Sequence, residues 1–178
     1  MNWIAPLLIV VLTVAAMEAV AWWTHKYIMH GWGWGWHKSH HEPHEGGFEL
    51  NDLYAVVFAA VSIGLFWWGQ SWWPATWLGA GMMLYGVLYF IAHDGLVHKR
   101  WPFTYIPRKG YLKRLYQAHR LHHAVDGKEG CVSFGFIYAP PVPKLVSQLD
   151  RNKSARSRPD VKPVAADGGG PTAWRQNG

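Results

Sequence analysis

The sequence has very little cysteine, and long parts of it carry no charge. Cys131 is the only cysteine among the 178 residues, which excludes an internal disulfide framework and fits a reducing compartment. Residues 53–92 contain no Lys, Arg, Asp or Glu, and residues 1–23 contain no Lys or Arg. Such long uncharged stretches favour helices that cross a membrane.

Sequence motifs that define many other enzyme classes are also missing. The chain contains no P-loop, dinucleotide-binding fingerprint, haem-attachment sequence or Ser-His-Asp constellation. A formal net charge of +6 could indicate nucleic acid, but no nucleic-acid-binding motif accompanies it. We therefore expect membrane lipids as partners and no nucleic acid, and any redox chemistry must draw its electrons from a partner protein.

Three apolar runs have the length of membrane-spanning helices. They cover residues 3–23, 53–68 and 72–92, and about twenty helical residues at ~1.5 Å each cross a ~30 Å hydrocarbon core. The first run could be a signal peptide, but no Lys or Arg precedes it, so we expect it to stay in the protein. Residues 131–143 are apolar but short and contain three prolines, which favours a re-entrant or interfacial segment.

These runs predict an all-α, integral membrane helical protein with three to four membrane spans or re-entrant segments. With three spans, residues 24–52 and 93–178 lie on the same side of the membrane. These two segments hold all 17 Lys and Arg and all 11 histidines. The positive-inside rule therefore predicts a multi-pass membrane protein with a histidine cage on the cytoplasmic side.

Two further parts of the chain are predicted outside the spans. Residues 111–123 have an apolar stripe at helical spacing, opposite a basic face, which predicts an interfacial helix. Hydrophobic periodicity is lost from about Gln148. We therefore divide the chain into a membrane-embedded histidine-box domain, residues 1–150, and a basic, largely disordered tail, residues 151–178.

Ten of the 11 histidines form four boxes in which two spacings each occur twice. The pairs with four intervening residues are His25 with His30 and His93 with His98, and the triplets are His37, His40, His41 and His119, His122, His123. On a helix, the first and last histidines of a triplet share a face. The two members of a pair lie ~140° apart on an ideal α-helix. Either the helix ends between them, so that the two side chains converge, or the two side chains bind different metals. We expect a helix end.

The number of histidines predicts how many metal ions they bind. One tetrahedral zinc uses three or four ligands, so ten histidines fit two metals with about five nitrogens each. Imidazole binds Fe, Cu, Ni and Zn alike, so the ligand type alone does not identify the metal. Open coordination positions beside the lipid phase suit O2 activation, which favours iron.

Four polar residues are candidates for orienting ligand histidines. Glu18 lies seven residues before His25 on the same helix face, and it either hydrogen-bonds that histidine or serves helix packing. Asn51, Asp52 and Asp94 lie next to the boxes, and they either orient histidines or cap helices.

Longer strings around the boxes resemble those of a known family. They are His25–Trp32 (HKYIMHGW), Asn51–Ala60 (NDLYAVVFAA), His93–His98 (HDGLVH), Ala118–Ala124 (AHRLHHA) and Lys128–Phe136 (KEGCVSFGF). Over about residues 1–147 the chain resembles the membrane-bound, histidine-box di-iron oxygenases of the fatty-acid hydroxylase superfamily. The boxes alone indicate the superfamily, whereas the longer strings resemble its carotenoid-hydroxylating branch.

The resemblance implies O2-dependent hydroxylation of carotenoid beta-ionone rings at C3. Beta-carotene would give zeaxanthin through beta-cryptoxanthin, and ring-ketolated carotenoids would also be accepted. All ten box histidines inherit the role of ligands to two non-haem iron ions. The resemblance also implies O2 as co-substrate, a carotenoid that enters from the lipid phase, and electrons from an external reductase or ferredoxin-like protein.

Two other functions remain compatible with the boxes. A fatty-acyl or sterol hydroxylase or desaturase of the same superfamily would use the same histidines. A membrane metal-transport or metal-storage protein would also be rich in histidine, but transporters place polar ligands near the middle of their spans. Here the histidines flank the spans on one side, which favours an enzyme.

Overall fold

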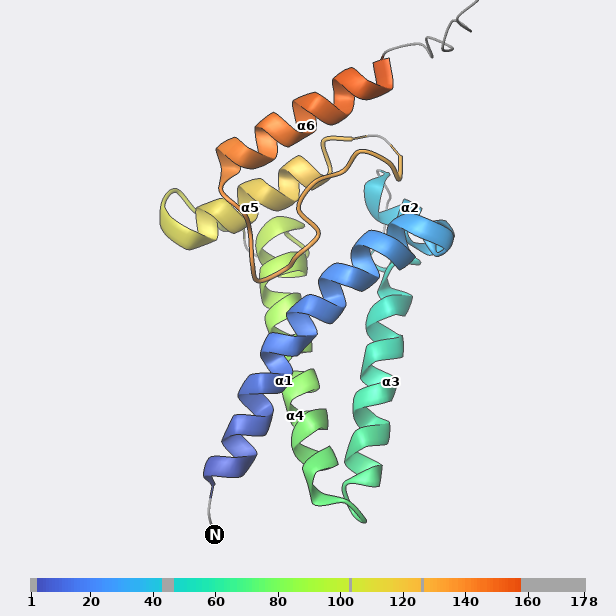
Figure 1. Ribbon diagram of the computed structural model, residues 1–178, viewed down its shortest axis with the longest axis vertical. Helices are drawn as coiled ribbons and strands as arrows, with labels where there is room; N and C mark the ends of the chain where they lie inside the picture. Colours follow the sequence, from blue (N-terminus) through green and yellow to red (C-terminus); the bar gives the residue numbers. More distant parts are fainter. Residues whose placement is uncertain (1–2, 43–46, 103, 126, 158–178) are drawn as a thin grey trace, which may run out of the picture.

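The computed structural model describes residues 3–42, 47–102, 104–125 and 127–157. Within these ranges the chain forms helices and irregular connections and contains no strand, which confirms the predicted all-α class (Figure 1). The helices form an elongated bundle, and shorter helices lie across one end of it.

Three helices build the bundle. α1 (Ile4–Trp23) continues into a π-helical segment, η1 (Thr24–Trp32), and α4 (Trp73–Tyr89) continues into a second one, η2 (Phe90–Val97). α3 (Asp52–Trp68) forms a hairpin with α4, and Pro74 lies in the first turn of α4, where proline is tolerated. α4 packs against both α1 and α3 and is therefore the central helix.

Small residues let the helices approach closely. A Cβ atom on Gly81 of α4 would lie 2.6 Å from Cβ of Thr13 on α1. A Cβ atom on Gly79 would lie 3.1 Å from the carbonyl oxygen of Ser62 on α3, and the Ser62 hydroxyl donates to the Gly79 carbonyl at 2.9 Å. In a membrane the hydrophobic effect does not drive helices together, and close packing of small residues stabilises their association instead.

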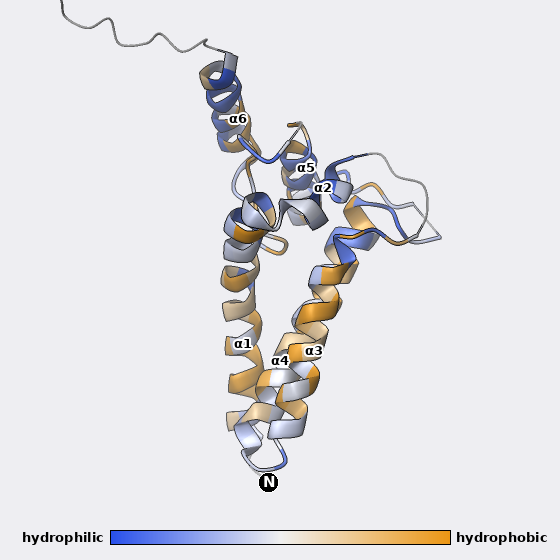
Figure 2. Ribbon diagram, turned by 90° about the vertical axis from the view of Figure 1, so that its right-hand side faces the viewer, coloured by the Kyte–Doolittle hydropathy of each residue, from blue (hydrophilic) through white to orange (hydrophobic). Residues whose placement is uncertain are grey.

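The bundle helices are largely hydrophobic along their length, as the colours in Figure 2 show. Two of its helical segments, Ile4–Trp32 and Trp73–Val97, are long and apolar enough to cross a membrane, whereas α3 is shorter, with 17 residues. Large side chains on all three helices are exposed, including Leu12, Ile63 and Val87. Soluble monomers rarely expose apolar patches of this extent, so the fold supports a membrane protein.

Three helices cover one end of the bundle: α2 (Trp34–His41), α5 (Gly110–His122) and α6 (Val142–Ser157). α5 confirms the helix predicted for residues 111–123. Between α5 and α6 the chain is irregular over residues 131–141 and dips toward α1 and α4 (Figure 1). Near the end of η1, Gly31 has backbone angles of φ −107° and ψ −123° that are not helical, so the chain bends there before α2 begins.

α6 differs from the sequence prediction. Residues 151–157 are helical where a disordered tail is predicted, because Leu145 and Leu149 bury one face of α6 in a core with Leu115 of α5 and Val132. Two apolar residues four positions apart give a periodicity too weak to recognise in the sequence. The remainder of the predicted tail, from residue 158, lies outside the described residues.

Candidate metal centre

All ten box histidines meet where the helical bundle joins the covering helices. η1 provides His25 and His30, and α2 provides the first triplet. His93 and His98 lie in and directly after η2, and the second triplet lies in and directly after α5. The eleventh histidine, His44, lies outside the described residues.

The two histidine pairs converge by a route that the sequence analysis does not consider. The π-helical segment η1 contains both His25 and His30, whereas η2 contains His93 and ends at Val97, directly before His98. The expected helix end is therefore found in the second pair and not in the first. The His98 amide donates to the His93 carbonyl at 3.0 Å, a hydrogen bond across five residues that is characteristic of a π-helix. The wider turn brings positions i and i+5 together, with ring centroids 5.2 Å apart for His25 and His30 and 4.5 Å for His93 and His98. The repeated spacing of five was the sequence signal for this winding.

The histidines divide into two groups. The ligand atoms of His25, His30, His37 and His122 lie within 4.8 Å of one another, as do those of His40, His93, His98 and His119. His41 adds its Nε2 to the first group, 3.2 Å from Nε2 of His37. His123 adds its Nε2 to the second, 3.0 Å from Nε2 of His119. We call these sets of five the first and second histidine groups.

The two groups have the same construction. Each contains one His-x4-His pair and the first and last histidines of one triplet. Each is completed by the middle histidine of the other triplet, so His122 joins the first group and His40 joins the second. The two triplets are therefore interlocked.

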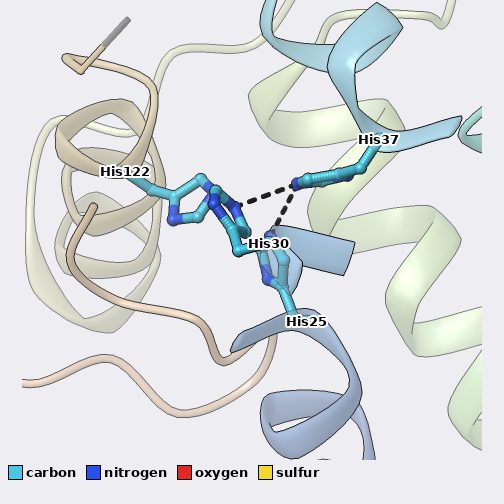
Figure 3. A group of neighbouring side chains, drawn as sticks. All are labelled: His25, His30, His37 and His122. Carbon is cyan, nitrogen blue, oxygen red and sulfur yellow. Dashed lines mark hydrogen bonds between the residues drawn. The ribbon is translucent and has the colours of Figure 1, made fainter. Parts of the chain in front are cut away.

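In the first group, three imidazoles donate their outward Nδ1–H to main-chain carbonyls. His25 donates to Phe134 at 3.0 Å, His30 to Lys128 at 2.8 Å and His122 to Val132 at 3.1 Å. A carbonyl only accepts, so Nδ1 carries the proton and Nε2 of each neutral ring keeps a bare lone pair. Nε2 of His30 faces Nε2 of His122 at 3.1 Å, and Figure 3 shows how the rings point at one another. Two facing lone pairs require a cation between them.

In the second group, carboxylates take the place of these carbonyls. Nδ1 of His40 lies 3.0 Å from Oε1 of Glu49, and Nδ1 of His93 lies 2.6 Å from Oδ1 of Asp94. Nε2 of His40 is buried and has no hydrogen-bond partner. A buried nitrogen without a partner is costly, and a metal ion would satisfy it.

The distances and charges fit metal ions. Within the groups, neighbouring Nε2 atoms lie 3.0–3.2 Å apart. With metal–nitrogen bonds of ~2.1 Å, ligands at right angles lie ~3.0 Å apart and tetrahedral ligands ~3.4 Å apart. Burial lowers the pKa of His37 to about 3, of His41 to about 4 and of His123 to about 2. These imidazoles are therefore neutral near pH 7, as metal binding requires.

The polar candidates from the sequence have different contacts. Asn51 accepts from Nδ1 of His37 at 2.7 Å, and Asp94 lies against His93 as described. Asp52 instead accepts from Arg100, at 2.7 and 2.8 Å. The polar residue that the sequence analysis missed is Glu49, nine positions after His40 in a loop with several other polar residues.

Glu18 is not hydrogen-bonded to His25. Its carboxylate accepts from the Tyr85 hydroxyl at 2.7 Å and from the main-chain amides of residues 136, 137 and 138 at 2.8–3.1 Å. These amides belong to the irregular segment of residues 131–141, which also contains the Phe134 carbonyl that orients His25. Glu18 therefore acts on the first group indirectly, by fixing the loop.

An apolar cavity of about 530 Å³ lies between α1, α3 and α4 and extends to aromatic residues that pack against the histidines. Its lining includes Phe58, Met82, Tyr89 and Phe136. Phe136 stacks on His25, with centroids 5.0 Å apart and ring planes 8° apart, and Tyr89 stacks on His93 with centroids 4.6 Å apart. Two aromatic residues of the cavity lining thus contact one histidine of each group.

Comparisons with known proteins agree with this site. The family model for fatty acid hydroxylases matches residues 10–140. Beta-carotene hydroxylase of Pantoea ananas is 67% identical over 88% of this chain and 90% of its own length, and that of Paracoccus sp. (strain PC1) is 61% identical over 88% and 97%. Beta-carotene 3-hydroxylase 2, chloroplastic, of Arabidopsis thaliana is 41% identical over 70% of this chain and 42% of its own length. No solved structure matches.

Proposed function

The chain belongs to the fatty acid hydroxylase family, and we propose that it hydroxylates carotenoid beta-ionone rings at C3 with O2 and two histidine-held iron ions. Beta-carotene gives beta-cryptoxanthin and then zeaxanthin, and ring-ketolated carotenoids are further substrates. The observation that carries the proposal is the apolar cavity whose aromatic residues Phe136 and Tyr89 stack on members of two groups of five histidines.

The histidine groups hold one iron each. When bound, the irons supply O2 activation at a C–H bond that acid–base side chains cannot attack. The chain itself orients the imidazoles through their outer nitrogens, and its buried aromatic residues keep water from the reaction. Phe136 and Tyr89 lie between the cavity and the two groups and place the ring beside the metals.

The cavity suits a hydrocarbon ring because its polar groups are already engaged. The Ser62 hydroxyl donates to Gly79, the Tyr85 hydroxyl to Glu18 and the Tyr54 hydroxyl to the Gly33 carbonyl at 2.8 Å. The lining therefore offers an apolar surface despite these hydroxyl groups. A carotenoid end group dissolved in the membrane gains favourable burial there and requires no polar partner.

We place the protein as a multi-pass protein of the inner membrane. α1, α3 and α4 cross it, and the histidine groups lie at the cytoplasmic face, where the basic residues are. Electrons come from a ferredoxin-like donor or reductase that docks on this face. The exposed basic residues of α5 and α6, which suit an acidic donor, are Lys113, Arg114, Arg120, Lys144, Arg151, Lys153 and Arg156.

The proposal is tested by expressing the full chain in cells that make beta-carotene and analysing their pigments and lipids. We expect beta-cryptoxanthin and zeaxanthin to form, and to be absent from the His119→Ala variant. The His44→Ala variant, which changes the one histidine outside the boxes, keeps the activity. Hydroxylated or desaturated acyl chains or sterols without hydroxycarotenoids would replace the proposal by the alternative enzyme of the same family.

A further inference from the structure

The outward nitrogens of the first histidine group meet only uncharged acceptors. His25, His30 and His122 donate to main-chain carbonyls, and His37 lies against the Asn51 amide oxygen. The carboxylate of Glu18 hydrogen-bonds the loop and Tyr85 instead of a histidine. The first group is thus held in place without a compensating negative charge at its hydrogen bonds.

In the second group, the outward nitrogens of His40 and His93 meet a buried acidic network. The Glu49 and His40 side chains are 3% and 1% exposed, and the Asp94 and His93 side chains are 13% and 2% exposed. Arg100 lies 3.5 Å from Glu49 and 3.6 Å from Asp94, and it pairs with Asp52 at 2.7 Å. The hydrogen bonds behind His40 and His93 therefore come from carboxylates that Arg100 holds together, and not from uncharged groups as in the first group.

This difference changes how the two groups bind a cation. A carboxylate that accepts from the outer nitrogen makes an imidazole a stronger donor to a metal, and its charge is weakly screened when it is buried. A carbonyl fixes the ring without this charge. The second group therefore binds positive charge better than the first, although both contain five imidazoles.

We propose that the two metal positions are inequivalent, and that Glu49 and Asp94, held by Arg100, are positioning residues that make the second histidine group the tighter metal site. The same charge favours the higher oxidation state there, so the iron of the second group is oxidised first. The inference rests on the proposed two-iron centre. It assigns each half of the centre its own affinity and reduction potential.

The test uses the full-length protein in detergent, loaded with ferrous iron without O2 and titrated with a chelator while iron per chain is measured. We expect two steps, in which one iron leaves and the other requires about 10- to 100-fold stronger chelation. Glu49→Gln and Asp94→Asn remove this difference, because they weaken the binding of the iron that the wild-type chain retains longer. Glu129→Gln, which neutralises an exposed acid, changes neither step.

The matched variant is Asn51→Asp, which places a carboxylate behind His37 of the first group. It strengthens retention of the iron that leaves first and shifts its midpoint potential toward that of the second. A misfolded variant cannot gain affinity, so this result separates positioning from a structural role. The inference would be overturned, and the proposed two-iron centre would stand, if the wild-type chain released both irons in one step. The same holds if Glu49→Gln changed the first step. Fewer than two irons in the wild-type chain would overturn the proposed centre and this inference together.

Discussion

The two histidine groups are alike in their ligands and unlike in what supports them. Each has five imidazoles in the same arrangement, which follows from box spacings that the sequence uses twice. The first group is supported by a loop after α5, through the carbonyls of residues 128, 132 and 134. The second is supported by side chains, mainly Glu49 and Asp94. Repetition in the ligands therefore does not imply two equal metal sites.

The loop that supports the first group is itself held from two sides. Glu18 of α1 accepts from its main-chain amides at residues 136–138, and Asn152 and Arg156 of α6 donate to the carbonyls of residues 130 and 129 at 2.9 and 2.8 Å. The first group thus depends on α1 and α6 as well as on its ligands. The second group depends on charged side chains that Arg100 brings together.

Replacing the middle histidine of a triplet, His40 or His122, gives the largest effect and tests the division of the histidines into two groups. We expect His122→Ala and His40→Ala each to lower activity by at least about 100-fold. Loss of a group that hydrogen-bonds a metal-binding histidine costs about 10- to 100-fold, and loss of the histidine itself costs more. His122→Ala loses the weakly held iron and His40→Ala the tightly held one, as measured by iron per chain after chelation. If both variants lost the same iron, the assignment of His122 to the first group and His40 to the second would be wrong.

Filling the cavity gives the next largest effect and leaves both groups intact. Gly86 lines the cavity and has no atom within 4 Å of a Cβ, so Gly86→Leu extends into the space that the ring would occupy. We expect conversion of beta-carotene to fall about 10- to 100-fold, with iron per chain unchanged. Gly64→Leu is the matched control, since Gly64 is equally open but lies outside the cavity lining. Equal losses in both variants would contradict the assignment of the cavity.

Weakening the loop gives a smaller effect that is confined to the first group. Glu18→Gln replaces charge-assisted hydrogen bonds, each worth ~1.5–3 kcal/mol, so we expect lower thermal stability and easier release of the first iron. Tyr85→Phe removes one donor to the same carboxylate and costs ~1 kcal/mol. Thermal unfolding and chelator titration measure both variants. Easier release of the second iron would show that the loop supports both groups.

Acid gives the smallest effect and distinguishes the groups by pH. Burial lowers the pKa of His37 to about 3, of His41 to about 4 and of His123 to about 2, below the ordinary value of 6.5. The unfolded chain therefore takes up protons first, and the stability of the metal-free fold decreases as pH falls from about 6.5 toward these values. The first group lacks the carboxylates that support His40 and His93 in the second, so we expect its iron to leave at higher pH. Iron per chain measured against pH would contradict this if both irons left together.

Much of the centre was predictable because its ligands follow simple spacings. The i, i+4 triplets share helix faces as expected, and the apolar runs predict the three long helices. The pairs spaced by five were interpreted only in part: a helix does end between His93 and His98, but an α-helix was assumed where η1 and η2 are π-helical. The carbonyl acceptors of His25, His30 and His122 leave no mark in the sequence, because every residue has a carbonyl. Glu49 and Arg100 find their partners only through the fold, 51 positions apart.

The interlocking of the triplets also bears on how the protein is made. The first group requires His122 and the second requires His40, so each draws on both halves of the chain. During synthesis, a ribosome that has released the chain through His98, with all three bundle helices, has completed neither site, although seven of the ten histidines have emerged. Iron loading therefore follows translation of α5, and a chain truncated before it has no complete metal site.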